Sequence, residues 1–177
     1  AQGSFLHARA ERIRGGDAAA AFRQALEDCE AVIRLSGADA PSLCNVAGVC
    51  LDLSDVLIAR GEDASAWVAR AQAACDEALR AAPGFAPALL VRARAAAGHE
   101  GGSLEERAER RRGAVTDLGE ALRQEPESAQ AWGDRGSLLG MLAQVEAALG
   151  RDPTASFDAA QAGHDEAVRR DGGSRGA

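Results

Sequence analysis

Four short stretches of this 177-residue chain repeat one pattern, in which a Glu-Ala pair lies between charged and aliphatic residues. The alanines of the four pairs follow one another at intervals of 47, 43 and 46 residues: Ala31, Ala78, Ala121 and Ala167. A longer match joins 61–78 to 150–167, which align without gaps and share 9 of 18 residues, beginning with Gly-x-Asp. Periods of about 20–50 residues are typical of arrays in which each unit buries its apolar surface against the next.

Each repeat is predicted to form two helices. One face of the segment 41–60 carries apolar residues at a spacing of three and four, the period of a helix: Leu43, Val46, Cys50, Leu53 and Leu57. Gly or Pro follows most of the periodic segments, as expected at helix ends. The expected helices cover 3–14, 18–36, 41–60, 64–82, 85–98, 103–125, 128–149 and 154–171, and no segment shows the alternation of a strand. We therefore expect a single all-α domain over 1–177, with about eight helices in four antiparallel pairs (1–37, 38–84, 85–127 and 128–172).

Small residues recur two turns apart on the second helix of the later pairs. Seven residues return a side chain to nearly the same direction around a helix, so these alanines share one face. They form three such couples: Ala71 with Ala78, Ala114 with Ala121, and Ala160 with Ala167. This spacing predicts close helix contacts at the alanines.

Composition excludes several other classes of protein. With 46% hydrophobic and 27% charged residues, the chain is too apolar to be intrinsically disordered. A net charge of −7 argues against a nucleic-acid partner, because phosphate binding needs clustered positive charge. No apolar run reaches the length of a bilayer span and no signal peptide is recognisable, so we expect a cytoplasmic protein without a membrane partner. The four cysteines form no CxxC pair and are expected to be reduced core residues: Cys29, Cys44, Cys50 and Cys75.

In its paired helices and recurring small residues, the chain resembles the tetratricopeptide repeat (TPR) family. The best match joins the end of one repeat to the start of the next: Ala114, Leu118, Ala121 and Pro126 at helix B positions, then Trp132, Gly136 and Leu139 at helix A positions. Gly48 takes the helix A glycine position of an earlier repeat. The resemblance covers nearly the whole chain and implies a right-handed solenoid.

The repeats depart from the family pattern in length and in two side chains. They are about ten residues longer than the usual repeat of about 34. Arg92 and Arg135 occupy a helix A position that is normally apolar. The long repeats with the linker 150–153 resemble the arrays attached to bacterial signalling kinases, although the chain carries no kinase motif.

In the resembled family, helix A side chains line a concave groove that holds an extended peptide. Carried over from Gly48 and Gly136, the resemblance implies a groove made of these residues: Ser42, Asn45, Val49, Asp52, Arg94, Gln130, Ser137 and Met141. The chain contains no Lys, and most residues of the family's carboxylate clamp are missing. Recognition of an acidic C-terminal peptide is therefore not expected.

Other candidate residues favour structural roles. The three histidines (His7, His99 and His164) are too scattered for a metal site, and His164 is interpreted as a core or half-buried residue. Asp52 and Asp55 lie one turn apart and could bind a cation or act as a carboxylate pair, but a solvated face is favoured. The glycines of 98–103 are expected in a loop between helices. The one basic cluster is interpreted as a surface ion-pair face, with an anion site as the alternative: Arg107, Arg110, Arg111 and Arg112.

Together these features predict a non-catalytic module that binds a protein or peptide partner in a concave groove, without a cofactor or metal. Two alternatives stay open. One is an all-α small-molecule sensor or enzyme with a pocket between repeats, and the other is the regulatory part of a larger signalling kinase. The sequence leaves the identity of the partner and the oligomeric state open.

Overall fold

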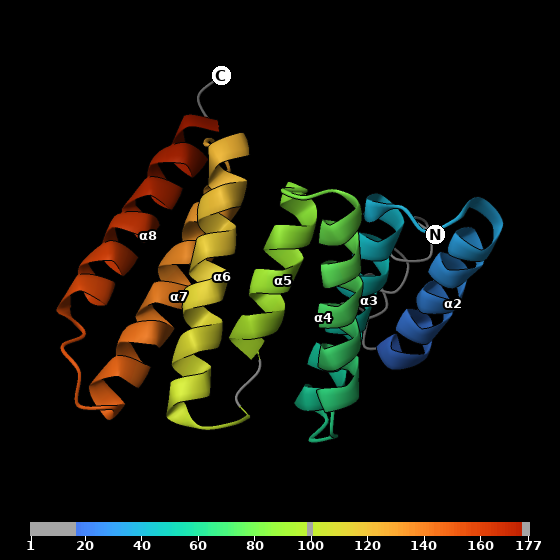
Figure 1. Ribbon diagram of the computed structural model, residues 1–177, viewed down its shortest axis with the longest axis horizontal. Helices are drawn as coiled ribbons and strands as arrows, with labels where there is room; N and C mark the ends of the chain where they lie inside the picture. Colours follow the sequence, from blue (N-terminus) through green and yellow to red (C-terminus); the bar gives the residue numbers. More distant parts are fainter. Residues whose placement is uncertain (1–16, 99–100, 175–177) are drawn as a thin grey trace. The chain divides into compact units, whose positions relative to one another are not determined.

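The computed structural model describes residues 17–98 and 101–174, and over these ranges it contains helices and no strand (Figure 1). The described helices are α2 (Ala18–Ser36), α3 (Ala40–Ala59), α4 (Ser65–Ala81), α5 (Ala86–Gly98), α6 (Leu104–Gln124), α7 (Ala129–Ala148) and α8 (Thr154–Ser174). Each of the seven begins and ends within three residues of its predicted bounds, so the all-α prediction is confirmed. The helix expected at 3–14, together with His7 and His99, lies outside the described residues.

The chain divides into two compact units, unit 1 up to Val91 and unit 2 from Arg92. In unit 1, α3 packs against both α2 and α4. In unit 2, α7 packs against both α6 and α8. Each unit is thus built around a central helix held between its neighbours in sequence.

The two units repeat each other residue by residue. Ala40 and Ala129 begin the central helices α3 and α7, Ala59 and Ala148 end them, and both intervals are 89 residues. The same interval separates Gly61 from Gly150, which have φ values of 74° and 71° and end the two helices. The repeat seen in the sequence at 61–78 and 150–167 therefore extends backwards through the whole central helix.

The linkers that follow the two central helices form the same hydrogen bonds. The backbone N–H of Glu62 donates to the Leu57 carbonyl at 2.9 Å, and that of Arg151 donates to the Glu146 carbonyl at 2.8 Å. The aspartate of each Gly-x-Asp then accepts from the start of the next helix. Asp63 accepts from the Ser65 N–H at 2.9 Å, and Asp152 accepts from the Thr154 N–H at 3.0 Å. A glycine in the left-handed conformation thus ends one helix, and an aspartate side chain accepts a hydrogen bond at the start of the next.

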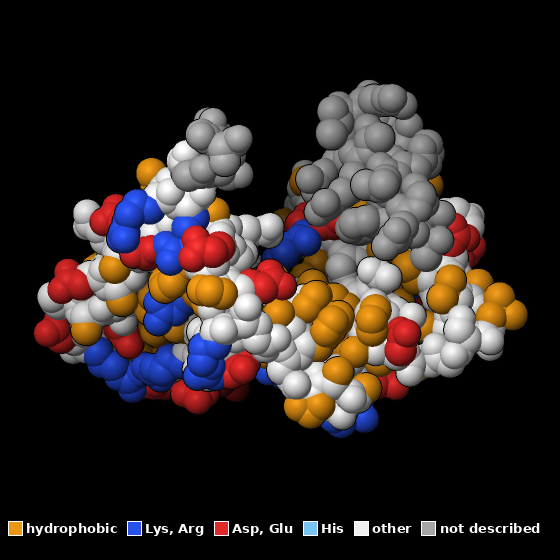
Figure 2. Space-filling view, turned by 90° about the horizontal axis from the view of Figure 1, so that it is seen from above, with side chains coloured by type: hydrophobic (Ala, Val, Ile, Leu, Met, Phe, Trp, Pro, Cys, Tyr) orange, Lys and Arg blue, Asp and Glu red, His pale blue; other side chains and the backbone are white. Residues whose placement is uncertain are grey.

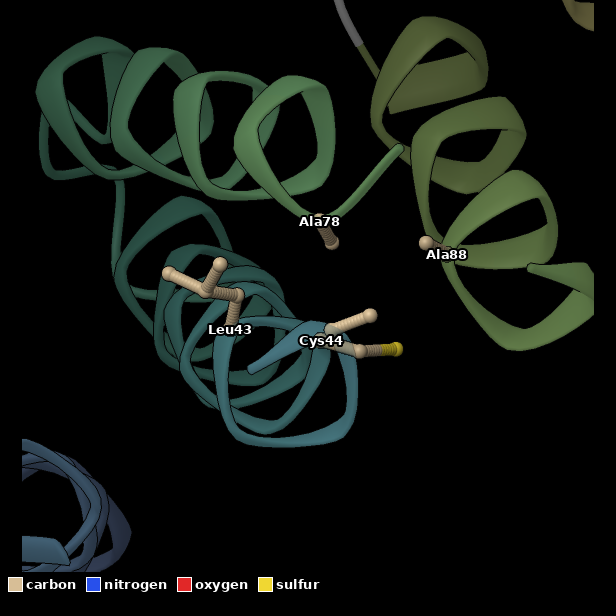
Figure 3. Packing of buried hydrophobic residues seen from close by; sticks show 5 residues of the cluster. Leu43, Cys44, Ala78 and Ala88 are labelled. Atoms are coloured by element: carbon tan, nitrogen blue, oxygen red, sulfur yellow. The ribbon is translucent and has the colours of Figure 1, made fainter. Parts of the chain in front are cut away.

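The core of unit 1 is made of small and medium side chains. One cluster joins α3, α4 and the start of α5, and in it the side chains of Cys44, Ala78 and Ala88 point toward one another (Figure 3). Ala78 and Ala88 are completely buried in this cluster. The predicted role of Ala78 at a close helix contact agrees with this packing.

All four cysteines are buried and unbridged, as predicted. Burial raises the pKa of the Cys44 thiol to about 11 and that of Cys50 to about 12. A thiol with such a pKa stays protonated and unreactive near neutral pH. The cysteines act as small apolar residues of the core.

The central helix α3 is long and apolar enough to cross a membrane by length and composition alone. Within its most apolar window, however, 67% of the residues are buried inside the structure. The core helix of a folded domain has the same character, so this helix is weak evidence for a membrane span. The apolar character of α3 follows from its contacts with two other helices.

In unit 2, α7 and α8 cross backbone to backbone. A Cβ atom added at Gly163 would lie 3.0 Å from the Cα and 3.1 Å from the N of Gly136. A Cβ at Gly136 would lie 2.9 Å from the carbonyl oxygen of Ala160. Both distances are shorter than ordinary carbon contacts of about 3.5–4.0 Å, so only glycine fits at either position.

The equivalent of Gly136 in unit 1 is Ala47, because 136 and 47 are 89 residues apart. Ala47 is completely buried. Gly48, which the family resemblance matched to Gly136, has room for a Cβ with no atom within 4 Å. That assignment was wrong by one residue, and one residue turns a side chain by about 100° around a helix.

Candidate interaction surface

An exposed row of side chains follows one face of the central helix of unit 2. Gln130, Asp134, Ser137 and Met141 are spaced by four, three and four residues, so they share that face. The first three are exposed and Met141 is half-buried. We call these four residues the α7 row. Three of them were predicted for the groove, and α7 brings them together.

Arg94 and Asp134 form the charged part of this surface. Desolvation raises the pKa of the Asp134 carboxyl, while the Arg94 charge and a hydrogen bond with Gln130 act in the opposite direction. Both charged residues nevertheless keep exposed area. The surface therefore offers a guanidinium and a carboxylate side by side, each able to contact a charged or backbone group of a partner.

An ion pair fixes the helix that carries Arg94. The Arg92 guanidinium donates to both oxygens of Asp117, each at 2.8 Å, and so joins α5 to α6. Asp117 is largely buried, which makes this bidentate pair stronger than an exposed one. The arginine at a normally apolar helix A position thus has a structural partner, and it holds α5 in place beside the surface.

The predicted basic cluster of α6 divides between the surface and the interior. Arg112 pairs with Glu109 and Glu146, at 3.4 Å each, as expected of an ion-pair face. Arg111 is only 3% exposed, which contradicts its prediction as a surface residue. Its Nη1 donates to the Met141 carbonyl at 3.3 Å, beneath the α7 row. The equivalent residue of unit 1 is Phe22, which is also buried. Both units therefore bury this position, but only unit 2 has a charged side chain there.

Figure 2 shows basic and acidic side chains interleaved over the visible surface of unit 2, at the left of that view. The interleaving agrees with the ion pairs between helices of this unit, such as Arg151 with Glu105 at 2.8 Å. Neighbouring carboxylates therefore compensate much of the positive charge on this surface.

The four groove residues predicted in unit 1 do not form a corresponding row. Asn45 is exposed and Ser42 is half-buried, but Val49 and Asp52 are each only 1% exposed. The prediction that Asp52 lies on a solvated face is therefore wrong, although Asp55 is exposed as predicted. The one-residue error at Gly48 accounts for Val49, whose equivalent in unit 2 is the buried Leu138. It does not account for Asp52, whose equivalent is Met141 of the α7 row; this position is buried in unit 1 and half-buried in unit 2.

His164 is exposed, which contradicts its prediction as a core or half-buried residue. Its ring lies over Gly136, where an added Cβ would be 3.0 Å from the ring atoms Cε1 and Nδ1. The equivalent residue of unit 1, Cys75, is completely buried. The His164 ring therefore contacts α7 on one side and is exposed on the other.

Sequence reasoning missed Asp134. A signal was present, because Asp134 lies four residues after Gln130 and three before Ser137, on the face already assigned to the groove. Among the described residues, no group of three or more His, Cys, Asp and Glu side chains is arranged to hold a metal ion. The arrangement on α7 is suited to recognition through hydrogen bonds and charge.

Comparisons with protein-family models and with curated proteins find no match to this sequence.

Proposed function

We propose that this protein is a non-catalytic interaction module that binds a protein or peptide partner through the α7 row and Arg94. The observation that carries the proposal is the juxtaposition of Arg94, Asp134 and Gln130 in an exposed position, next to Ser137 and Met141. A peptide offers the groups that such a surface recognises: backbone amides, carbonyls and charged side chains.

The rigid setting supports this proposal. The row lies on a central helix that packs against a helix on each side, and Arg94 lies on a helix fixed by the Arg92–Asp117 pair. A backbone held in this way loses little entropy on binding, which favours affinity. The TPR family and a right-handed solenoid are parts of the same proposal, supported by the consecutive packed helices and by the small residues where helices meet. A cytoplasmic location is proposed with them.

The test is affinity capture with the whole chain, followed by titration of the captured protein. We expect Arg94→Ala and Asp134→Ala each to weaken binding by about 10–150-fold, as for the loss of one hydrogen bond to a charged group. Ser137→Ala has a matched control in Thr116→Ala. Both hydroxyls donate to a carbonyl of their own helix at 3.0 Å, and only Ser137 lies on the proposed surface.

Equal binding by the wild-type protein and by the Arg94 and Asp134 variants would refute the proposed surface. Circular dichroism melts of each variant show whether a loss of binding comes from unfolding. Because these side chains are exposed, the melting temperature should change little.

A further inference from the structure

The outer face of α8 carries apolar side chains that no described residue covers. Phe157 is 48% exposed and Val168 is 71% exposed, and they belong to the few large apolar side chains left exposed in the described residues. Eleven residues are about three helical turns, so the two lie on the same face, with Gln161 and His164 between them. We call these four residues the α8 stripe. In Figure 1, α8 forms one edge of unit 2.

Unit 1 shows that the fold normally covers this face. The residues equivalent to Phe157 and His164 are Val68, which is 5% exposed, and Cys75, which is completely buried. The equivalent of Val168 is Leu79, which packs against the cluster that contains Phe85 and Ala88 at the start of α5. A helix face that is buried in one repeat and open in the other is an unfilled packing surface.

The stripe is complementary to itself in the antiparallel direction. A two-fold axis passing near residues 162 and 163 would place Phe157 opposite Val168 of a second copy, and Gln161 opposite His164. Gln and His side chains can hydrogen-bond to each other, so the polar middle of the stripe would be satisfied. Both ends of the stripe would bury an aromatic ring against a valine.

The charges beside the stripe obey the same symmetry. Asp158 and Arg169 are also eleven residues apart, so they lie on one side of the stripe. A two-fold axis brings like sides of the two helices together in opposite directions, which places Asp158 of each copy between Asp165 and Arg169 of the other. The Arg169 side chain also pairs with Glu166 of its own helix, but it is 68% exposed and so can reach the other copy.

We propose that the chain self-associates through α8, with the two copies antiparallel about a two-fold axis. The occupant of the stripe is thus a second copy of this chain. We prefer it to an unrelated helix because, in the antiparallel arrangement, Phe157 meets Val168 and Asp158 comes near Arg169. Two-fold interfaces are built from one patch that faces itself. One pair of helix faces buries less than the about 1,600 Å² of a standard interface, so the dimer should be weak and depend on concentration.

The experiment is sedimentation velocity of the whole chain over a wide concentration range. We expect a reversible monomer–dimer equilibrium, and a loss of the dimer in Phe157→Asp and Val168→Asp. The matched control is Leu35→Asp, which changes an exposed leucine of α2 (88% exposed) and should leave the dimer unchanged. Asp134→Ala should also dimerise normally, which separates this inference from the proposed function of the α7 row.

A charge exchange tests the antiparallel register. Asp158→Arg alone and Arg169→Asp alone should each weaken the dimer several-fold, and the double variant should recover most of the wild-type affinity. A chain that stays monomeric at all concentrations would overturn the proposal, as would a dimer that survives both Asp substitutions in the stripe. Failure of the double variant to recover would overturn the antiparallel register. Binding of a different protein's helix to the stripe without self-association would overturn the proposal.

Discussion

The glycine crossing of α7 and α8 makes a sharp prediction for Gly163→Ala. The added methyl group would meet the Gly136 Cα at 3.0 Å, the Gly136 N at 3.1 Å and the Trp132 carbonyl oxygen at 3.2 Å. All three are backbone atoms, which cannot rotate away as a side chain could. The two helices would have to separate by about 0.5–1 Å to restore ordinary contacts, which weakens every other contact along the crossing.

Two opposing effects set the magnitude. Overpacking of this kind costs about 1–3 kcal/mol, whereas Ala stabilises a helix interior by about 1 kcal/mol relative to Gly. The net loss of unfolding free energy relative to the wild type should therefore be about 0–2 kcal/mol. For a chain of this size the melting temperature falls by about 2–4 °C per kcal/mol, so we expect a decrease of up to about 8 °C.

Gly140→Ala is the matched control, because it lies on α7, one turn beyond Gly136, and an added Cβ there would have no atom within 4 Å. Only the helix preference changes at this position, so the variant should be neutral or more stable by up to about 1 kcal/mol. The difference between the two variants cancels the helix preference and isolates the cost of the crossing.

The assay is urea denaturation followed by tryptophan fluorescence. The chain has two tryptophans, Trp67 in unit 1 and Trp132 in unit 2, so a Trp67→Phe background makes the signal report on unit 2. A lower midpoint with an unchanged slope would show a loss of stability. If Gly163→Ala and Gly140→Ala had the same midpoint, the close crossing would be refuted.

Three further predictions concern the helix cap, the cysteines and the buried arginine. The pKa of Asp152 lies below its usual value near 3.8 because Thr154 donates to it through its hydroxyl and backbone N–H. Its stabilisation is therefore present above about pH 4 and lost as the pH falls through the lowered pKa, and Asp152→Ala should reduce the acid dependence of the unfolding free energy measured by urea titration. The four thiols should not react with a disulfide reagent at pH 8 in the folded protein and should all react in denaturant. The number of reacted thiols is measured by absorbance. Rapid reaction of the Cys50 thiol, whose pKa is about 12, would contradict its burial. Arg111→Ala should lower the unfolding free energy by about 2–4 kcal/mol, because it opens a cavity and removes the donor to the Met141 carbonyl, and a calorimetric melt equal to that of wild type would contradict the buried position.

The helices could be predicted from the sequence because their ends carry local signals. Gly61 and Gly150 take a left-handed conformation that other residues avoid, and Asp39 and Ser103 cap α3 and α6 through their side chains. These interactions involve residues only two to five positions apart. Sequence patterns capture such short-range effects well.

The errors concern which face of a helix meets another helix. Position 48 differs from position 47 by one residue, and the family pattern alone did not separate them. The internal repeat could have done so, because extending the ungapped match backwards from Gly61 aligns Ala47 with Gly136. The same match aligns Arg111 with Phe22 and so indicates an interior position for Arg111. The exposure of His164 had no such signal, because it depends on which side chains of other helices cover the site.

The matching linkers of the two units also bear on how the chain folds. The most extensive helix contacts within each unit join neighbours in sequence, so most loops closed during folding are short and cost little entropy. Topologies dominated by such local contacts fold fast, in the microsecond to millisecond range for small helical domains. Because the linkers share one hydrogen-bond pattern, 61–65 and 150–154 should be exchangeable, and a chimaera that carries either linker twice should fold at nearly the same rate as the parent chain.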